Sequence, residues 1–292
     1  MKIVVFGKEF KETFNDAIYK IFEKLNKKKV YIQIYKPFYD FINQNLFFEP
    51  KVDKVFSYFE EIENETSIVL SIGGDGTFLE TVSFMKESKI PFIGINSGRL
   101  GFLASISKEE IDTLLEKLLN SDYSICRRSL LEIEIENKLI QKSFALNELT
   151  VYKKDNSSMI NIEVKINGHY LNTYWADGLI ISTPTGSTAY SLSAGGPIIM
   201  PEAHNFVITP IAPHTLTVRP IIVADTDEID ILVKGRGEQF IAAVDSNVYF
   251  IDYQTKIKIK KAKFEINTIK FDETEFFIIL RKKLMWGLDL RN

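Results

Sequence analysis

A glycine-rich turn carries the most informative chemistry in this 292-residue sequence. Gly73-Gly74-Asp75-Gly76-Thr77 follows the apolar run 67–72 and precedes a helical pattern. Glycines let the main chain approach a bulky ligand closely, and a helix that begins at Thr77 directs unpaired N–H groups at an anion. The single carboxylate, Asp75, repels phosphate unless it binds a metal or takes a proton from an attacking hydroxyl. We interpret Asp75 as a carboxylate that either binds a metal or accepts a proton; a tight turn with Asp75 as a helix cap is the alternative.

A second polar pair, Asn147-Glu148, precedes the β-prone run 149–152. A carboxylate accepts hydroxyl protons and an amide both donates and accepts, so together they can receive a ribose diol. A polar turn with no ligand is the alternative for this pair.

The segment 174–190 combines an acidic loop, an apolar strand pattern and the run Thr183-Pro184-Thr185-Gly186-Ser187-Thr188-Ala189-Tyr190. Hydroxyls and free amides around a glycine turn suit phosphate or sugar oxygens, and Tyr190 offers a flat face to a base. A structural turn made by Ser and Thr hydroxyls explains only part of this density. The sequence has no P-loop and no protein-kinase catalytic loop, and its three histidines lack metal-ligand spacing.

Composition excludes several classes of protein. With 45% hydrophobic and 26% charged residues, the chain has enough apolar material for a full core. The formal net charge of −3 argues against generic binding to nucleic acid or to a membrane surface. No apolar run approaches the ~18 residues of a spanning helix, and the sequence enters a strand pattern directly, without a signal peptide. A single cysteine, Cys126, permits no internal disulfide, so we expect a cytoplasmic protein.

Strand and helix patterns alternate in the first part of the chain, where Ser107 and Glu110 form a capping box before an apolar helix face. Strands are predicted at 2–6, 30–35, 67–72 and 91–95, and helices at 10–27, 37–47 and from residue 77. Alternation of this kind predicts a mostly parallel sheet covered by helices on both faces.

After about residue 125 period-two patterns dominate, including a hairpin signal at Asn167-Gly168 and β-type runs at 256–260 and 264–269. We therefore predict an α/β N-terminal domain over 1–125, Rossmann-like with a mostly parallel sheet, and a mainly β C-terminal domain over 126–275. The segment 276–292 is predicted as an apolar strand at 276–280 and a tail that can pack back on the first domain.

The motifs of this chain, in this order and over nearly its whole length, resemble those of NAD kinases. The glycine turn alone also occurs in lipid kinases and phosphofructokinases. Its combination with Asn96-Ser97-Gly98-Arg99-Leu100-Gly101-Phe102-Leu103, with the Thr183 to Tyr190 run and with Pro213-His214-Thr215-Leu216 is far more specific. The resemblance implies transfer of the terminal phosphoryl group of ATP to the 2′-hydroxyl of the adenosine ribose of NAD, giving NADP. It also implies a divalent metal, Mg²⁺, and a homodimer or homotetramer.

The resemblance further implies the roles of individual residues. Asp75 is the proton acceptor and Gly76 lies against NAD; Asn147 and Glu148 hold ribose hydroxyls or adenine; Leu79 and Phe102 wall the adenine-side pocket. Asp177 contacts NAD, in some members across a subunit interface. The remaining NAD-site positions are Trp175, Thr185, Thr188, Ala189, Tyr190, Ser191, Leu192, Ser193, Ala212 and Asn247.

Two of these positions depart from the family's pattern. Asn247 stands where a longer Gln or a His is expected, and Trp175 stands where many relatives carry a basic or smaller residue. No residue is assigned as a metal ligand. Two other functions stay open at this point: a kinase of a diacylglycerol-type lipid, and a non-catalytic NAD(P) sensor on the same fold.

Overall fold

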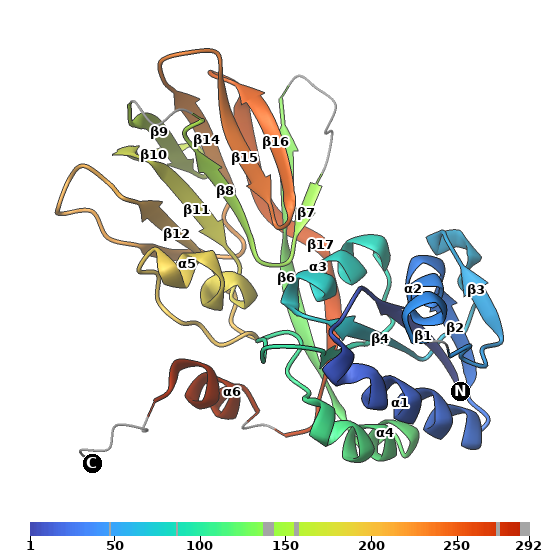
Figure 1. Cartoon of the computed structure of the whole chain (residues 1–292). Helices are drawn as coiled ribbons and strands as arrows, with labels where there is room; N and C mark the ends of the chain where they lie inside the picture. The colour runs from blue at the N-terminus through green and yellow to red at the C-terminus, as the bar shows by residue number, and fades with distance from the viewer. Residues whose placement is uncertain (47, 86, 137–142, 155–157, 273–274, 287–292) are drawn as a thin grey trace. The chain divides into compact units, whose positions relative to one another are not determined.

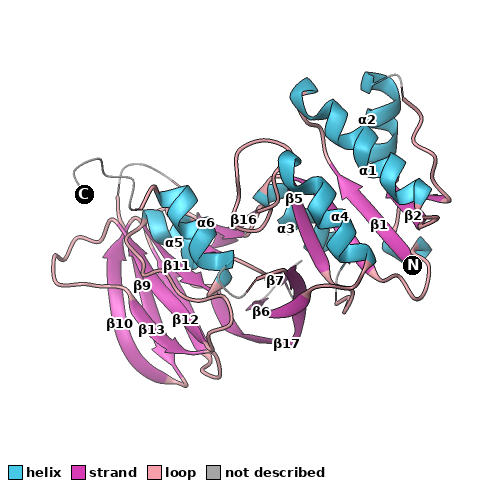
Figure 2. Cartoon of the chain, turned by 90° about the horizontal axis from the view of Figure 1, so that it is seen from below, coloured by secondary structure: helices cyan, strands magenta, loops and turns pink. Residues whose placement is uncertain are grey.

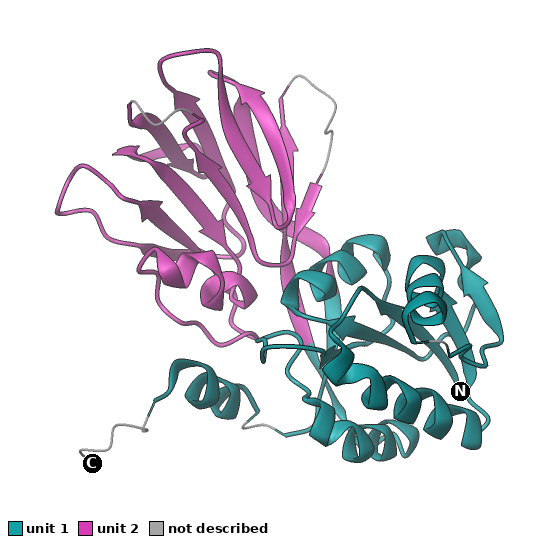
Figure 3. Ribbon diagram, viewed as in Figure 1, with its two compact units in different colours: residues 1–126, 266–292 teal, residues 127–265 magenta. Residues whose placement is uncertain are grey.

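The computed structural model describes residues 1–292 except 47, 86, 137–142, 155–157, 273–274 and 287–292. The chain divides into two compact units (Figure 3), of which unit 1 is Met1–Cys126 with Ile266–Asn292 and unit 2 is Arg127–Glu265. The α-helices are α1 (Asn15–Lys27), α2 (Lys36–Leu46), α3 (Asp75–Met85), α4 (Ile111–Leu119), α5 (Tyr190–Ser193) and α6 (Glu275–Leu284), with 3₁₀ turns at Glu12–Phe14, Phe59–Glu61, Lys108–Glu110 and Thr185–Thr188. The strands are β1 (Lys2–Gly7), β2 (Tyr31–Tyr35), β3 (Lys54–Phe56), β4 (Ile68–Gly73), β5 (Phe92–Asn96), β6 (Ser124–Ile135), β7 (Ser143–Ala145), β8 (Glu148–Tyr152), β9 (Ile160–Ile166), β10 (His169–Ala176), β11 (Gly178–Ser182), β12 (Asn205–Ile211), β13 (Ile221–Ala224), β14 (Ile229–Lys234), β15 (Gln239–Val244), β16 (Asn247–Asp252) and β17 (Lys256–Lys270).

Unit 1 is built on a parallel sheet with the strand order β17-β5-β4-β1-β2-β3 (Figure 1). Because successive side chains of a strand point to opposite faces, Ile3 and Val5 of β1 join the core formed with α1, α2 and α4, whereas Val4 and Phe6 face the other side. On that other side Phe6 packs against Phe84 of α3. The prediction of a mostly parallel α/β domain is confirmed.

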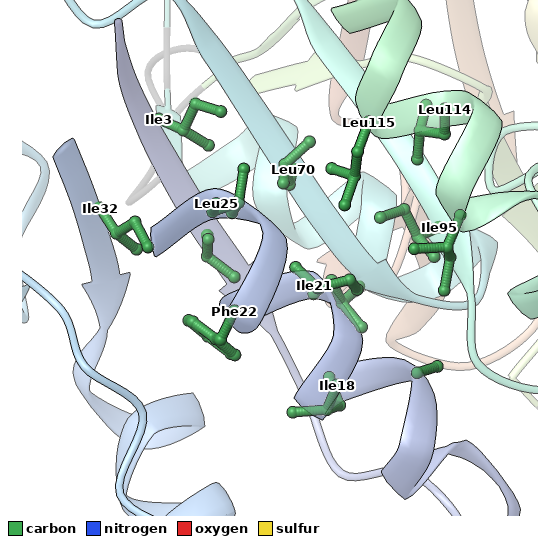
Figure 4. Close-up of a cluster of buried hydrophobic side chains, with 14 of the residues drawn as sticks. Ile3, Ile18, Ile21, Phe22, Leu25, Ile32, Leu70, Ile95, Leu114 and Leu115 are labelled. Atoms are coloured by element: carbon green, nitrogen blue, oxygen red, sulfur yellow. The ribbon is translucent and has the colours of Figure 1, made fainter. Parts of the chain in front are cut away.

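Buried aliphatic side chains hold α1 and α4 to the parallel sheet. Figure 4 shows Ile18, Ile21 and Phe22 of α1 beside strand residues such as Leu70, with Leu114 and Leu115 of α4 in the same cluster. This packing holds the carboxyl ends of β4 and β5 in place, and the glycine turn and the segment 97–104 leave the sheet from those ends.

Unit 2 is almost entirely antiparallel sheet (Figure 2). One sheet has the order β13-β12-β11-β8-β15-β16, and the other contains β10, β9, β14 and the first part of β17. Their facing side chains form one hydrophobic core, so the prediction of a mainly β unit is confirmed. The Asn167-Gly168 turn joins β9 to β10 with φ of 52° and 78°, as the hairpin signal predicts.

Two predicted elements differ from the structure. The run 276–280 is not a strand: it lies in α6, because a short apolar run does not distinguish helix from strand and the following basic residues suit a helix C-terminus. The runs 256–260 and 264–269 form one continuous strand, β17, whose beginning pairs with β14 in unit 2 and whose end pairs with β5 in unit 1. None of the helices in the described part of the chain has the length and apolar character needed to cross a bilayer.

Candidate active site

The carboxylate of Asp75 is held by three successive main-chain N–H groups. The N–H of Phe102 donates to Oδ2 at 2.9 Å, and those of Leu103 and Ala104 donate to Oδ1 at 3.0 and 2.9 Å. A carboxylate offers about four acceptor positions, so three of them are occupied. One acceptor position of Asp75 is therefore left for a further donor.

Glycines on both sides make this close approach possible. A Cβ on Gly101 would lie 1.9 Å from Oδ1 of Asp75, and one on Gly94 would lie 2.6 Å from the main chain of Ala104. Gly76, in contrast, has no atom within 4 Å of the position that a Cβ would take. The first two glycines thus serve internal packing, whereas Gly76 presents bare main chain to the surroundings.

Asn96, the last residue of β5, shapes the segment that supplies the three N–H groups. Its Nδ2 donates to the carbonyls of Arg99 (2.5 Å) and Ala104 (3.2 Å), and its Oδ1 accepts from Gly98 N (2.6 Å). The resemblance singles out this segment as a motif, but it does not show that its main chain holds Asp75. Leu79, on α3, and Phe102 are both half-buried in unit 1.

Unit 2 contains a second carboxylate held in the same way. Asp245 accepts from the N–H groups of Leu146 (2.8 Å), Asn147 (3.0 Å) and Glu148 (3.0 Å). Burial raises the pKa of Asp245, and these three hydrogen bonds oppose the rise. No sequence motif predicts these contacts, because Asp245 lies 97 to 99 positions away from its partners.

Asp245 lies at the turn between β15 and β16 with φ of 49°. A left-handed conformation is uncommon for a residue other than glycine, and it is the only local feature that sets Asp245 apart. Asn247, two residues later, is exposed at the start of β16. Its assignment to the NAD site stays a prediction.

Glu148 is an acid whose pKa is strongly raised. Burial raises its pKa to about 8, the neighbouring Asp245 adds to the rise, and a hydrogen bond from the main chain of Tyr190 opposes it. Its Oε2 is buried and has no hydrogen-bond partner among the described residues. A buried polar atom without a partner is uncommon and costly, and such atoms are frequent at functional sites.

The hydroxyls of the Thr183 to Tyr190 run mostly hold the run itself together. Thr183 Oγ1 donates to the carbonyl of Leu146 at 2.5 Å, and Ser187 Oγ donates to that of Pro184 at 2.7 Å. Ser191 Oγ lies 2.9 Å from another buried hydroxyl, that of Thr209. These hydroxyls therefore stabilise the turn itself, and this structural role accounts for more of them than the sequence pattern indicated.

Other groups of the same segment remain accessible. Tyr190 is 46% exposed, Ser193 is exposed, and Leu192 is half-buried. A Cβ on Gly186 would lie 2.2 Å from the carbonyl oxygen of Asn147, so this turn packs directly on the Asn147-Glu148 pair. Tyr190 contacts Glu148 through its main chain, and the other predicted site positions on the same 3₁₀ turn and short helix are Thr185, Thr188, Ala189, Ser191, Leu192 and Ser193.

Trp175, Asp177 and Ala212 gather elsewhere in unit 2. Asp177 forms an ion pair with Lys153 at 2.7 Å, and its N–H donates to the carbonyl of Ile211, next to Ala212. Trp175 is 52% exposed and stacks on a histidine ring, that of His214, at 4.7 Å.

This second group is separated from Glu148 by the length of β11. In the β8–β11 pairing Glu148 lies opposite Ser182, whereas Gly178, next to Asp177, lies opposite Tyr152. At about 3.4 Å per residue, the two ends are on the order of 15 Å apart. One copy of unit 2 therefore does not bring all of the predicted NAD-site residues together.

A groove of about 810 Å³ opens in unit 1 beside the segment 97–100. Its lining includes three cationic side chains, Lys11, Arg99 and Lys108, and two acidic ones, Glu9 and Glu109. The volume is in the range of small-molecule sites, and the cations suit the phosphates of a nucleotide.

Within the described ranges no group of three or more His, Cys, Asp or Glu side chains is arranged to hold a metal ion. Mg²⁺ in phosphoryl-transfer sites commonly keeps several waters and binds one or two carboxylates together with substrate phosphates. Asp75, with one acceptor position left, fits such a minimal site but not a cage formed by protein alone.

The fold and these groups define a class. An α/β unit whose glycine turn carries one carboxylate, joined to a β unit with a buried acid, suits a phosphotransferase that acts on a nucleotide. Family models for the ATP-NAD kinase N-terminal domain and C-terminal domain match residues 4–123 and 146–271. The NAD kinases of Flavobacterium psychrophilum and of Bacteroides fragilis strain ATCC 25285 are 44% and 42% identical to the chain, each over 100% of both chains. The chain belongs to the ATP-NAD kinase family.

Solved structures agree with this assignment. Yeast NADH kinase complexed with NADH matches with a TM-score of 0.88 over 100% of this chain and 89% of that one, at 24% identity, and so supports the fold. An NAD kinase from Archaeoglobus fulgidus in complex with ATP matches with a TM-score of 0.76 over 98% of this chain and 100% of that one, at 26% identity.

Gly101→Ala tests the packing around Asp75. The added methyl group cannot coexist with the observed position of Oδ1, so the carboxylate and the segment 102–104 must shift. Because a misplacement of about 1 Å can cost about 10²-fold in rate, we expect kcat to fall by about that factor. Steady-state kinetics measure the effect, and circular dichroism checks that the variant is folded. Normal turnover would show that the observed contact is not needed for catalysis.

Glu148→Gln tests the buried acid through stability. The pKa of Glu148 is about 8 in the folded chain against 4.5 for the ordinary group, so the folded state holds a proton that the unfolded state releases. The free energy of unfolding should therefore fall as the pH rises from about 4.5 to about 8, by up to roughly 1.4 kcal/mol per pH unit from this residue. The variant should show a shallower fall in chemical denaturation.

The exposed Glu238 provides the matched control, since Glu238→Gln removes a carboxylate of the same size without burial. Glu238→Gln should leave the pH dependence of stability as in the unmodified chain. An unchanged slope for Glu148→Gln would contradict the raised pKa.

Proposed function

We propose that Asp75 is the proton acceptor for the reaction of this family, and that the Asn147-Glu148 cluster holds the acceptor nucleotide. The chain phosphorylates NAD to give NADP. The observation that carries the proposal is the pair of carboxylate clusters: Asp75 in the glycine turn, with one acceptor position left, and Glu148, with a buried oxygen that lacks a partner. A positioned carboxylate contributes about 10²- to 10⁴-fold by taking a proton from a weak hydroxyl nucleophile.

Glu148 suits a ribose because the diol supplies the hydrogen bonds that its Oε2 lacks. Asn147 is buried beside it, and the main chain of both residues is held by Asp245. Tyr190, half-exposed and adjacent to Glu148 through its main-chain N–H, offers a ring face for the adenine. The 2′-hydroxyl of the adenosine ribose is then the group presented for phosphorylation.

We place the phosphates of ATP, as the donor, along the groove of Lys11, Arg99 and Lys108, since it combines cationic side chains with a volume suited to a nucleotide. Mg²⁺, where bound with the donor, would be held by the phosphates and by Asp75, and it would neutralise charge on the phosphoryl oxygens. The donor's identity and the cytoplasmic location both stay predictions.

We also propose that the active form is a homodimer or homotetramer. The support is the separation of Asp177 and Trp175 from Glu148 along β11, which leaves these two residues available to an NAD molecule held by another copy. The exposed Trp175 and the partly exposed Asp177 are available for such a contact.

Asp75→Asn tests the catalytic role. The amide still accepts from two N–H groups through its oxygen, but its NH₂ group takes no proton and cannot accept from a third. We expect kcat to fall at least about 10²-fold, whereas the affinity for NAD changes much less, because NAD is held mainly in unit 2. A coupled assay with ATP, Mg²⁺, NAD and an NADP-specific dehydrogenase measures turnover, and calorimetry measures NAD binding.

The product of the unmodified chain supplies the decisive comparison. Phosphorus NMR should show phosphate only at the 2′-position, and an NAD analogue without the 2′-hydroxyl should bind and accept no phosphate. A 3′-phosphate, or a phosphorylated lipid with NAD untouched, would overturn the assignment.

Mixing two defective variants tests the shared site. Subunits with Asp75→Asn and subunits with Asp177→Ala should each be slow alone. If Asp177 acts across the interface, a mixed dimer contains one complete site, and random pairing restores roughly a quarter of the unmodified activity. Activity equal to the mean of the two separate variants would show that Asp177 acts within its own subunit or not at all.

A further inference from the structure

Helix α6 is attached to unit 1 by few buried side chains. Of its residues, only Ile279 and Leu280 are fully buried, and its last turn carries three basic residues. A pocket of about 250 Å³, lined by residues that include Leu114 of α4 and Ile278 of α6, lies beneath it. Polar contacts also attach the helix to unit 1.

Those polar contacts lead from both ends of α6 to one segment of the chain. Near the start of the helix, Ser105 Oγ donates to Oε1 of Glu275 at 3.2 Å. Near its end, Lys283 Nζ donates to the carbonyl of Leu100 at 2.5 Å and lies 5.4 Å from the centre of the Phe102 ring. The segment 100–105 is thus held at two points by the same helix.

The same segment supplies the N–H groups that hold Asp75. Phe102, whose ring lies under the Lys283 ammonium, donates its N–H to Oδ2 of Asp75 at 2.9 Å. Leu100, whose carbonyl accepts from Lys283, precedes Gly101, which packs against Oδ1 of Asp75. The contacts of Lys283 and those of the carboxylate are therefore made by the same residue, Phe102, or by adjacent residues, Leu100 and Gly101.

We infer that Lys283 is a positioning residue for Asp75: by holding Leu100 and Phe102, it keeps the main-chain N–H groups of 102–104 on the carboxylate. This inference rests on the proposed function of Asp75 as the base. None of the contacts places Lys283 on the reacting atoms, so its effect on catalysis is transmitted through the segment 100–104.

The chain offers a matched control in the adjacent Lys282. Both lysines lie in the last turn of α6, where a cation interacts favourably with the helix dipole, so removing either charge has a similar effect on the helix itself. Lys282 lines the pocket beneath the helix and makes no hydrogen bond or ion pair with another described residue. Only Lys283 contacts the segment that holds Asp75.

The experiment compares Lys283→Met, Lys283→Arg and Lys282→Met in the full chain. Because small misplacements of a catalytic group are costly, Lys283→Met should lower kcat about ten-fold and change the KM for NAD less than about two-fold. Lys283→Arg, which keeps a cation and donors, should recover most of the loss. Lys282→Met should behave as the unmodified chain.

Hydrogen exchange gives a readout that does not depend on turnover. The amides of Phe102, Leu103 and Ala104 should exchange faster in Lys283→Met than in Lys282→Met, because their hydrogen bonds to Asp75 are less well held. Unchanged exchange and kcat in Lys283→Met, or equal losses in both Met variants, would overturn the inference. If the unmodified chain does not phosphorylate NAD, the proposed function fails, and the exchange data still decide whether Lys283 holds the segment.

Discussion

The hydrogen bonding of one carboxylate to three successive main-chain N–H groups is the interaction on which the rest of this structure depends. It occurs twice, at Asp75 with 102–104 and at Asp245 with 146–148. Hydrogen bonds to charged groups contribute about 1.5–3 kcal/mol each, and loss of the acceptor leaves several donors without partners. The glycines at 94 and 101 follow from this interaction, since any side chain there would collide with the segment or with the carboxylate.

The two clusters place carboxyl groups in very different electrostatic surroundings. Asp75 has a neighbouring Gly76 that presents bare main chain, whereas Glu148 is buried close to a second acid, Asp245. Burying two acids together is unfavourable unless at least one is neutral or a ligand supplies donors. The raised pKa of Glu148 expresses that cost, and a hydroxyl-bearing ligand would relieve it. If Glu148 holds the nucleotide as proposed, stability is given up at a binding position.

Sequence patterns predicted the fold because both units use regular periodicities: alternating strands and helices up to Leu119, and period-two strands with an Asn-Gly hairpin later. They also located Asp75, because its cluster begins at a local glycine turn. They did not locate Asp245, which holds residues almost a hundred positions away and whose only local mark is a positive φ. The prediction of a strand at 276–280 is wrong because five consecutive apolar residues fit a strand and a helix equally well, whereas the basic residues after them suit the last turn of a helix.

Main-chain recognition also explains which changes the site tolerates. The N–H groups that hold Asp75 and Asp245 come from residues as different as Phe102, Ala104 and Asn147, because every residue except proline supplies the same donor. Side chains in these segments are therefore free to adapt to a ligand while the carboxylates stay in place. Trp175 and Asn247 make none of the hydrogen bonds to the two carboxylates, so these interactions do not constrain the residue type at either position.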